Sequence, residues 1–129
     1  YEGSLKLKEI SYINSFAIAA GELKHGTIAL IEDDTFIVAL ATQNALYDKM
    51  LSNIKEVKAR GAHVFAIAKS GNDQILKTAD EVFFIPNTMD ELAPILAVVP
   101  TQLLAYYVSA LRGNDVDKPR NLAKSVTVE

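Results

Sequence analysis

The sequence predicts an α/β fold of three layers, α/β/α, around a mainly parallel sheet. Residues 36–41 and 63–68 are short apolar runs, and a segment with helical periodicity lies between them. A third apolar run, 81–85, is stopped by Pro86. Nearly continuous apolar runs are typical of strands covered on both faces, and strand–helix–strand links join parallel neighbours. This order of elements favours helices on both faces of one sheet.

The helix between the first two strands has recognisable ends. Thr42 or Asn44 can cap its first turn with a side-chain oxygen. Arg60 and Gly61 suit its last turn, because a cation complements the helix dipole and glycine accepts a positive φ. The apolar positions recur with helical spacing at Leu46, Met50, Ile54 and Val57. These signals predict one helix that buries a single face.

Two apolar helices are predicted after the third strand. The first covers about 90–98 and contains Pro94, which should begin or kink it. The second covers 100–112, with Pro100 in its first turn and Gly113 at its end. Its apolar residues leave no clean polar face: Leu103, Leu104, Tyr106, Tyr107 and Val108. This pattern suits either a buried core helix or an interface between subunits.

The first thirteen residues fit two structures. Leu5 and Leu7 alternate with Lys6 and Lys8, as in a strand, whereas the wider apolar spacing up to Ile13 fits a helix. Periodicity alone does not decide between them.

The bulk composition excludes several classes of function. A chain of 129 residues is expected to form one domain, and its net charge of −3 offers no footprint for nucleic acid. No apolar run reaches the roughly 18 residues that cross a bilayer, so no membrane partner is expected. Zero cysteines fit a cytoplasmic protein, and two histidines without cysteine make a poor metal set. The sequence has no Gly-x-Gly-x-x-Gly or Walker loop for a nucleotide cofactor. Because it does not begin with methionine, we interpret the chain as a piece of a longer polypeptide.

Three segments carry a resemblance to a known family. They are Glu-Gly-Ser-Leu-Lys-Leu-Lys-Glu-Ile-Ser-Tyr at 2–12, Gly-Glu-Leu-Lys-His-Gly at 21–26, and the tail 115–129 with its Asn-Leu-Ala-Lys-Ser ending. Together they resemble glucosamine-6-phosphate synthases (glutamine–fructose-6-phosphate aminotransferases, isomerizing), specifically the second sugar-isomerase (SIS) half of the isomerase region. The resemblance implies a SIS domain over 1–112, a helical N-terminus, and a tail over 113–129 that contributes to the active site.

The resemblance also implies an activity and partners. The family converts fructose 6-phosphate and glutamine-derived ammonia to glucosamine 6-phosphate in hexosamine biosynthesis, without a cofactor or metal. The expected partners are the first SIS domain, the glutaminase domain and a second copy in a homodimer, all in the cytoplasm. The phosphate-binding loops and the glutaminase nucleophile are not found in this chain. The isolated chain is therefore expected to be inactive.

Glu9 and Lys6 are the first candidate catalytic residues. A carboxylate beside two adjacent carbons can move a proton between them, and Glu9 matches the isomerisation base of the family. Lys6 matches a lysine near the same reacting atoms, where a cation can keep the base ionised or stabilise an enolate oxygen. From spacing alone, Lys6 and Glu9 fit an ordinary surface ion pair three residues apart on a helix. Spacing also does not separate Lys6 from Lys8.

The other candidates are His25, Lys124 and Ala123. A histidine can open a sugar ring near neutral pH, and His25 matches the family histidine assigned to this step, which comes from a neighbouring subunit. Lys124 matches a lysine assigned to Schiff-base formation or ring opening, and Ala123 matches a residue whose backbone contacts the sugar. Arg120 is expected to hold the tail through a forked pair with Asp115 or Asp117.

Two other functions remain possible from the sequence. One is a non-catalytic module that binds sugar phosphates, as in SIS-containing regulators. The other is a related sugar-phosphate isomerase or deglycase, whose members commonly lack this tail.

Overall fold

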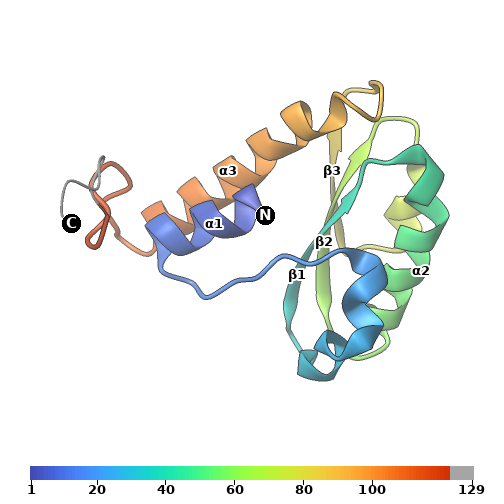
Figure 1. The fold of residues 1–129 in the computed structure, drawn as a ribbon, viewed down its shortest axis with the longest axis horizontal. Helices are drawn as coiled ribbons and strands as arrows, with labels where there is room; N and C mark the ends of the chain where they lie inside the picture. The colour runs from blue at the N-terminus through green and yellow to red at the C-terminus, as the bar shows by residue number, and fades with distance from the viewer. Residues whose placement is uncertain (123–129) are drawn as a thin grey trace. The chain divides into compact units, whose positions relative to one another are not determined.

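The computed structural model describes residues 1–122, and the chain divides into two compact units (Figure 1). The first unit joins residues 1–17 to the chain from residue 98 onward, and the second is formed by residues 18–97. Each unit is described by itself below.

The second unit contains a three-stranded parallel sheet in the order β1-β2-β3, as the sequence predicts. Phe36 of β1 lies opposite His63 of β2, and Phe65 of β2 lies opposite Glu81 of β3. The strands are β1 (Phe36–Ala41), β2 (His63–Lys69) and β3 (Glu81–Ile85).

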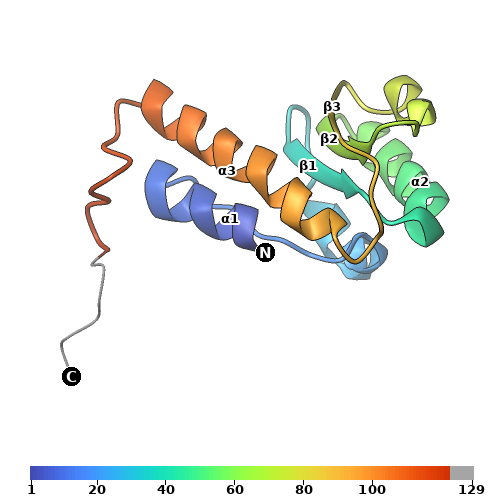
Figure 2. The ribbon, with the colours of Figure 1, turned by 90° about the horizontal axis from the view of Figure 1, so that it is seen from above.

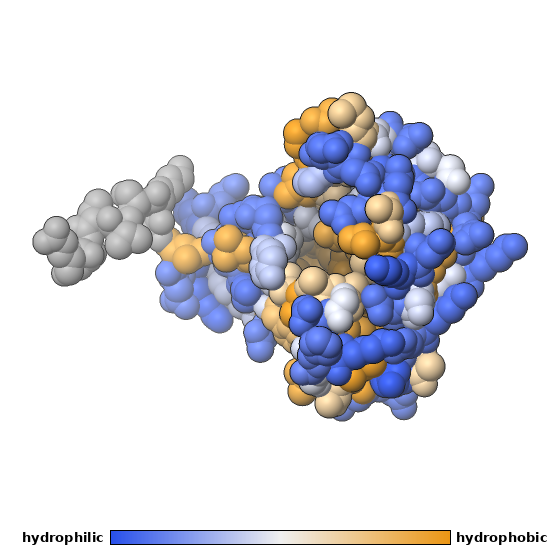
Figure 3. Space-filling model, turned by 45° about the vertical axis from the view of Figure 1, so that its right-hand side comes forward, coloured by the Kyte–Doolittle hydropathy of each residue, from blue (hydrophilic) through white to orange (hydrophobic). Residues whose placement is uncertain are grey.

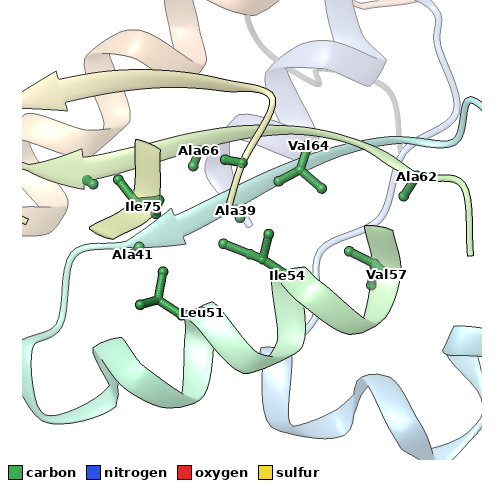
Figure 4. Packing of buried hydrophobic residues seen from close by; sticks show 11 residues of the cluster. Ala39, Ala41, Leu51, Ile54, Val57, Ala62, Val64, Ala66 and Ile75 are labelled. Carbon is green, nitrogen blue, oxygen red and sulfur yellow. The ribbon is translucent and has the colours of Figure 1, made fainter. Parts of the chain in front are cut away.

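Both faces of this sheet are covered, which confirms the three layers. Helix α2 (Tyr47–Lys58) packs on one face, where its apolar side chains point toward the small residues of β1 and β2 (Figure 4). This cluster includes Leu51, Ile54, Val57, Ala39, Val64 and Ala66. On the other face, Ile67 and Ile85 pack with Leu96 and Ala97 from the beginning of α3. Burial on both sides explains why these strands are apolar at successive positions.

The ends of α2 follow the prediction only at the C-terminus. Gly61 has φ 90°, and the amides of Gly61 and Ala62 bond back to Lys58 and Val57 in a Schellman arrangement. At the N-terminus the predicted cap is wrong, because no side chain caps the helix and residues 44–46 form a 3₁₀ turn instead. The Asn44 amide donates to a distant acceptor, the carboxylate of Asp90, at 2.9 Å.

Helix α3 (Ala93–Leu111) is one continuous helix, so the prediction of two helices is wrong. Pro94 lies in the first turn as expected, but Pro100 lies inside the helix. Proline removes one helical hydrogen bond, and packing of small residues on both sides of Pro100 keeps the helix intact. Gly113, with φ 74°, lies just beyond its end.

Because Pro100 does not divide it, α3 is long and apolar enough to cross a membrane by length and composition, alone among the helices of residues 1–122. The core helix of a soluble protein passes the same test when it is mostly buried, whereas 22% of the apolar window of α3 is buried here, including Ala97 and Ala105.

In the first unit, the N-terminal residues are helical rather than extended. Helix α1 (Glu2–Lys6) continues into a π-helical turn (Leu7–Ser11), and α1 lies along α3 in both ribbon views (Figures 1 and 2). A Cβ atom on Gly3 would come within 2.7 Å of the Thr101 Cβ, so glycine permits this close approach.

In the second unit, the remaining short helices are 3₁₀ turns at Ala20–His25, Thr27–Leu30 and Asp73–Lys77.

Candidate active site

Glu9 lies in the middle of the π-helical turn that follows α1. π turns are rare and are found often at functional sites, because the wider turn redirects a side chain out of the regular helical pattern. The buried Ser11 hydroxyl donates to the Leu7 carbonyl at 2.5 Å across this turn. Tyr12 ends the turn in a left-handed conformation, with φ 61°. The local geometry thus fixes the backbone that carries Glu9.

Residues distant in sequence also hold this turn. The hydroxyl of Ser109, which is buried on α3, donates to the Ile10 carbonyl at 2.6 Å. The Asn114 amide lies 3.4 Å from the Ile10 oxygen and 3.5 Å from the Ser11 oxygen. These donors satisfy carbonyls that the end of a helix leaves without partners. The end of α3 therefore positions the turn that presents Glu9.

Glu9 and Lys6 form a close ion pair. The Lys6 ammonium donates to the Glu9 carboxylate at 2.6 Å, and Glu2 lies farther from the same ammonium, at 3.8 Å. The Glu9 side chain is 25% exposed and that of Lys6 is 36% exposed. The hydrogen bond to Glu9 raises the pKa of Lys6 above its ordinary value, and burial opposes this shift only in part. The ion pair thus places a cation directly beside the carboxylate that is the candidate base.

The structure separates Lys6 from Lys8, which the spacing could not do. Lys8 is exposed, and its ammonium donates to the Ser15 carbonyl at 3.1 Å rather than to Glu9. Lys6 is the cation that contacts the carboxylate.

Glu9 opens onto a shallow recess of about 260 Å³. Asn121 and Leu122, from the end of the described chain, line it together with Lys8, Glu9 and Tyr12, whereas Lys6 reaches it only through its contact with Glu9. Polar and apolar side chains thus meet around one carboxylate that solvent can reach. A larger recess of about 450 Å³ lies between α1 and residues 16–17, but it does not include Glu9. We therefore take the smaller recess as the candidate site.

Arg120 holds the tail, as predicted, but its partner is Tyr12 rather than the predicted carboxylate of Asp115 or Asp117. The Arg120 amide donates to the Tyr12 hydroxyl at 2.9 Å, and its guanidinium carbon lies 4.1 Å from the centre of the tyrosine ring. Asp115, one of the acids expected to pair with Arg120, instead accepts the amides of Asp117 and Lys118. The carboxylate satisfies its own turn first, because those donors are adjacent along the chain.

The other predicted site residues are His25, Ala123 and Lys124. His25 ends a 3₁₀ turn of the second unit, is 73% exposed, and has its Nδ1 atom 3.1 Å from Glu22. Ala123 and Lys124 lie outside the described residues. Their roles, like those of Glu9 and Lys6, stay predictions.

A second ion pair, between Lys69 and Asp90, was not predicted from the sequence. Lys69 ends β2, its side chain is 1% exposed, and its ammonium donates to the Asp90 carboxylate at 2.5 Å and to the Thr88 carbonyl at 2.9 Å. This hydrogen bond lowers the pKa of Asp90, as does the bond from the Asn44 amide. The available signal was a lysine that directly follows five apolar residues of a buried strand.

Among residues 1–122, no group of three or more histidine, aspartate or glutamate side chains could hold a metal ion.

Comparisons with known proteins identify relatives of this chain by sequence and by structure. Glutamine–fructose-6-phosphate aminotransferase (isomerizing) from Caldanaerobacter subterraneus subsp. tengcongensis is 68% identical over 128 residues, and that from Clostridium acetobutylicum is 62% identical. Each match covers 99% of this chain and 21% of the relative, so the chain spans about a fifth of their length. The solved C-terminal domain of glucosamine-fructose-6-phosphate aminotransferase from Francisella tularensis has a TM-score of 0.81 and 40% identity, covering 88% of this chain and 32% of that one.

The resemblance predicted from the sequence is confirmed by these relatives. The family profile described as SIS domain matches residues 1–112, which include every strand of the sheet and all of α3. A parallel sheet with helices on both faces, in a chain that matches this profile over most of its length, establishes that the protein belongs to the SIS domain family.

Proposed function

We propose that this chain is the second SIS half of the isomerase region of a glutamine–fructose-6-phosphate aminotransferase. In this role ammonia first condenses with the C2 carbonyl of the sugar and water leaves. Glu9 then takes a proton from C1 of the resulting imine and returns it to C2, which gives a 2-amino aldose. The observation that supports it best is Glu9 itself, held by a π turn, paired with Lys6 and open to a recess. Its identity to relatives of that name supports the same substrate.

Lys6 assists the base in this proposal. Its ammonium can stabilise the negative charge that develops when the proton leaves C1. Lys124 provides the amine that opens the sugar or forms a Schiff base at C2, Ala123 contributes backbone contacts, and His25 opens the ring. The support for these three assignments is their match to the sequence pattern of the family.

The proposed partners are the first SIS domain, the glutaminase domain and a second copy of the protein, in the cytoplasm. Hydrophobic side chains lie exposed at several places on the face drawn in Figure 3. Four of the exposed large hydrophobic residues of α3, all at least 43% exposed, are Val99, Leu103, Tyr106 and Tyr107. Their spacing forms one stripe of a helix, which a partner can cover. The short span of this chain relative to its relatives supports the same view.

The test is Glu9→Gln in the full-length aminotransferase that contains this chain. Glutamine keeps the size of the side chain but cannot accept the proton, so fructose-6-phosphate isomerisation should fall by about 10²–10⁴-fold. Glu2→Gln is the matched control, because Glu2 also neighbours Lys6 but does not line the recess. The control should retain activity, and the 129-residue chain alone should show none. Full activity of Glu9→Gln would remove Glu9 as the base.

A non-catalytic sugar-phosphate module gains no support from these observations. Such a module has no use for an exposed base with its own cation, and the relatives compared above are named as aminotransferases.

A further inference from the structure

Tyr12 adopts a backbone conformation that is unusual for its type. Its φ of 61° lies in the left-handed region, which aromatic residues seldom adopt unless their surroundings hold them there. Its amide bonds to the Lys8 carbonyl at 3.2 Å and ends the π turn. This reversal directs the chain away from the helix and leaves the ring beside the turn that carries Glu9. The proposed chemistry of Glu9 does not itself explain this tyrosine.

Tyr12 makes two different contacts with one residue of the tail. Its hydroxyl oxygen accepts the Arg120 amide at 2.9 Å, and its ring lies under the Arg120 guanidinium at 4.1 Å. One contact uses the polar end of the side chain, and the other uses its aromatic face. They join residues that are 108 positions apart in the sequence.

The segment that Tyr12 holds is already ordered by local contacts. Asp115 accepts the amides of Asp117 and Lys118, which forms a tight turn, and Pro119 restricts the backbone directly before Arg120. A single attachment point therefore sets the direction of the chain that follows. Asn121 and Leu122, the next two residues, line the recess that contains Glu9.

We propose that Tyr12 is a positioning residue that latches the C-terminal tail onto the Glu9 turn and so completes the wall of the active-site recess. The inference rests on the proposed function for its catalytic consequence, but not for the latch itself. Tyr12 itself lines this recess beside Glu9, and its proposed role is to position Asn121 and Leu122 there.

Trypsin measures the latch directly in the 129-residue chain. The enzyme must take the Arg120 side chain into its own pocket to cut the bond to Asn121, and the neighbouring Lys118 is protected because proline follows it. Tyr12→Phe keeps the ring and loses the acceptor, so the initial rate of this cut should rise about 2–10-fold. Tyr12→Leu also loses the ring face and should add a further factor of about 2–5. Trypsin can also cut after Lys124, so mass spectrometry of the 121–129 and 121–124 peptides together gives the rate of the cut after Arg120.

Two controls keep this measurement interpretable. The cut after Arg112, also an exposed arginine beyond the core of α3, reports any general loosening and should keep its rate. Tyr106→Phe removes the hydroxyl of another exposed tyrosine and should leave the cut after Arg120 unchanged. Equal cleavage after Arg120 in Tyr12→Leu and in the unsubstituted chain would overturn the latch. Faster cleavage after both arginines in Tyr12→Phe would also overturn it, since the effect would be general unfolding.

The catalytic consequence is tested in the full-length aminotransferase. With Tyr12→Phe the tail is docked for a smaller fraction of the time, so the KM for fructose 6-phosphate should rise about 2–10-fold. The kcat should stay the same, because a saturating substrate that contacts the docked tail restores docking. A merely structural role would lower the amount of folded enzyme and leave KM unchanged.

The outcomes separate the latch from the function. If Glu9→Gln abolishes isomerisation while Tyr12 variants alter neither cleavage nor KM, the latch is wrong and the proposed function stands. If Tyr12 variants release the tail but Glu9→Gln is fully active, the latch stands and the proposed function is wrong.

Discussion

Two lysine–carboxylate pairs, one in each unit, show how burial divides chemistry from structure. In the first unit Lys6 contacts Glu9 at 2.6 Å, and both side chains remain at least a quarter exposed. In the second unit Lys69 contacts Asp90 at 2.5 Å; the lysine side chain is 1% exposed, whereas the aspartate side chain is 33% exposed. The two lysines thus lie at similar distances from their carboxylates but differ greatly in solvent exposure.

The number of partners differs as much as the burial. Asp90 accepts both the Lys69 ammonium and the Asn44 amide, and Lys69 also donates to the Thr88 carbonyl. Among residues 1–122, Glu9 has Lys6 as its one cationic partner within 4 Å. A charge whose hydrogen bonds are satisfied inside the protein holds segments together, whereas an exposed one keeps capacity for a ligand. The Lys69–Asp90 pair therefore stabilises the fold, whereas the Lys6–Glu9 pair remains available for a reaction.

The largest expected effect comes from Asp90→Ala. This substitution leaves the ammonium of Lys69 buried without its carboxylate. Stranding a buried charge costs about 3–5 kcal/mol of the free energy of unfolding. Urea unfolding of the 129-residue chain, followed by circular dichroism, should show a large drop in the midpoint.

Two variants serve as controls for this effect. Adding Lys69→Met to Asp90→Ala removes the stranded charge and should recover most of the lost stability, since an apolar pair of similar volume is often neutral. Glu9→Ala breaks the exposed pair and should change the free energy of unfolding by no more than about 1 kcal/mol. If Asp90→Ala and Glu9→Ala had the same small effect, the distinction between the two pairs would be lost.

The same comparison explains what could be predicted from the sequence. The strands follow from apolar runs, and the end of α2 follows from Gly61, because both depend on local patterns. The contact between Lys6 and Glu9 also follows from local spacing, since residues three apart on a helix are neighbours.

Contacts between distant residues could not be predicted in this way. Asp90 follows Lys69 by 21 positions, and Arg120 follows Tyr12 by 108, so no periodicity relates the partners. The continuity of α3 through Pro100 likewise depends on packing that a local rule does not contain. In the predicted active site, the contact at Glu9 joins residues close in sequence, whereas the contact that holds the tail joins distant residues. Only the first could be predicted from the sequence.

A second, smaller effect should appear in acid. The Lys69 hydrogen bond lowers the pKa of Asp90, and the Lys58 hydrogen bond lowers that of Asp80. A carboxyl group with a lowered pKa in the folded protein stabilises it above the unfolded pKa, about 3.9, and this stability is lost as the pH falls through the folded value.

Urea midpoints between pH 6 and pH 2 should therefore decrease below about pH 4. The double variant Lys69→Met/Asp90→Ala should show a shallower decrease, which retains the part due to Asp80. An unchanged acid dependence in this variant would contradict a role for the buried pair in the pH response.

The smallest effect should appear in alkali, at the exposed pair. The Glu9 hydrogen bond raises the pKa of Lys6 above 10.5. A lysine with a raised pKa in the folded protein stabilises it fully below its unfolded pKa, and this contribution is lost as the pH rises through the folded value. Urea midpoints should thus fall slightly more above about pH 10.5 in the unsubstituted chain than in Lys6→Met.

Lys8→Met is the matched control, because Lys8 lies on the same segment but binds the Ser15 carbonyl instead of Glu9. It should keep the alkaline decrease of the unsubstituted chain. Raising the salt concentration from 0.05 M to about 0.5 M should weaken the Lys6 effect, since solvent ions screen a pair that is partly exposed. The same salt change should leave the cost of Asp90→Ala nearly intact, because solvent ions do not reach the buried ammonium of Lys69. Equal salt sensitivity of the two pairs would mean that burial does not distinguish them. The exposure of the Lys6–Glu9 pair would then no longer support its availability for chemistry.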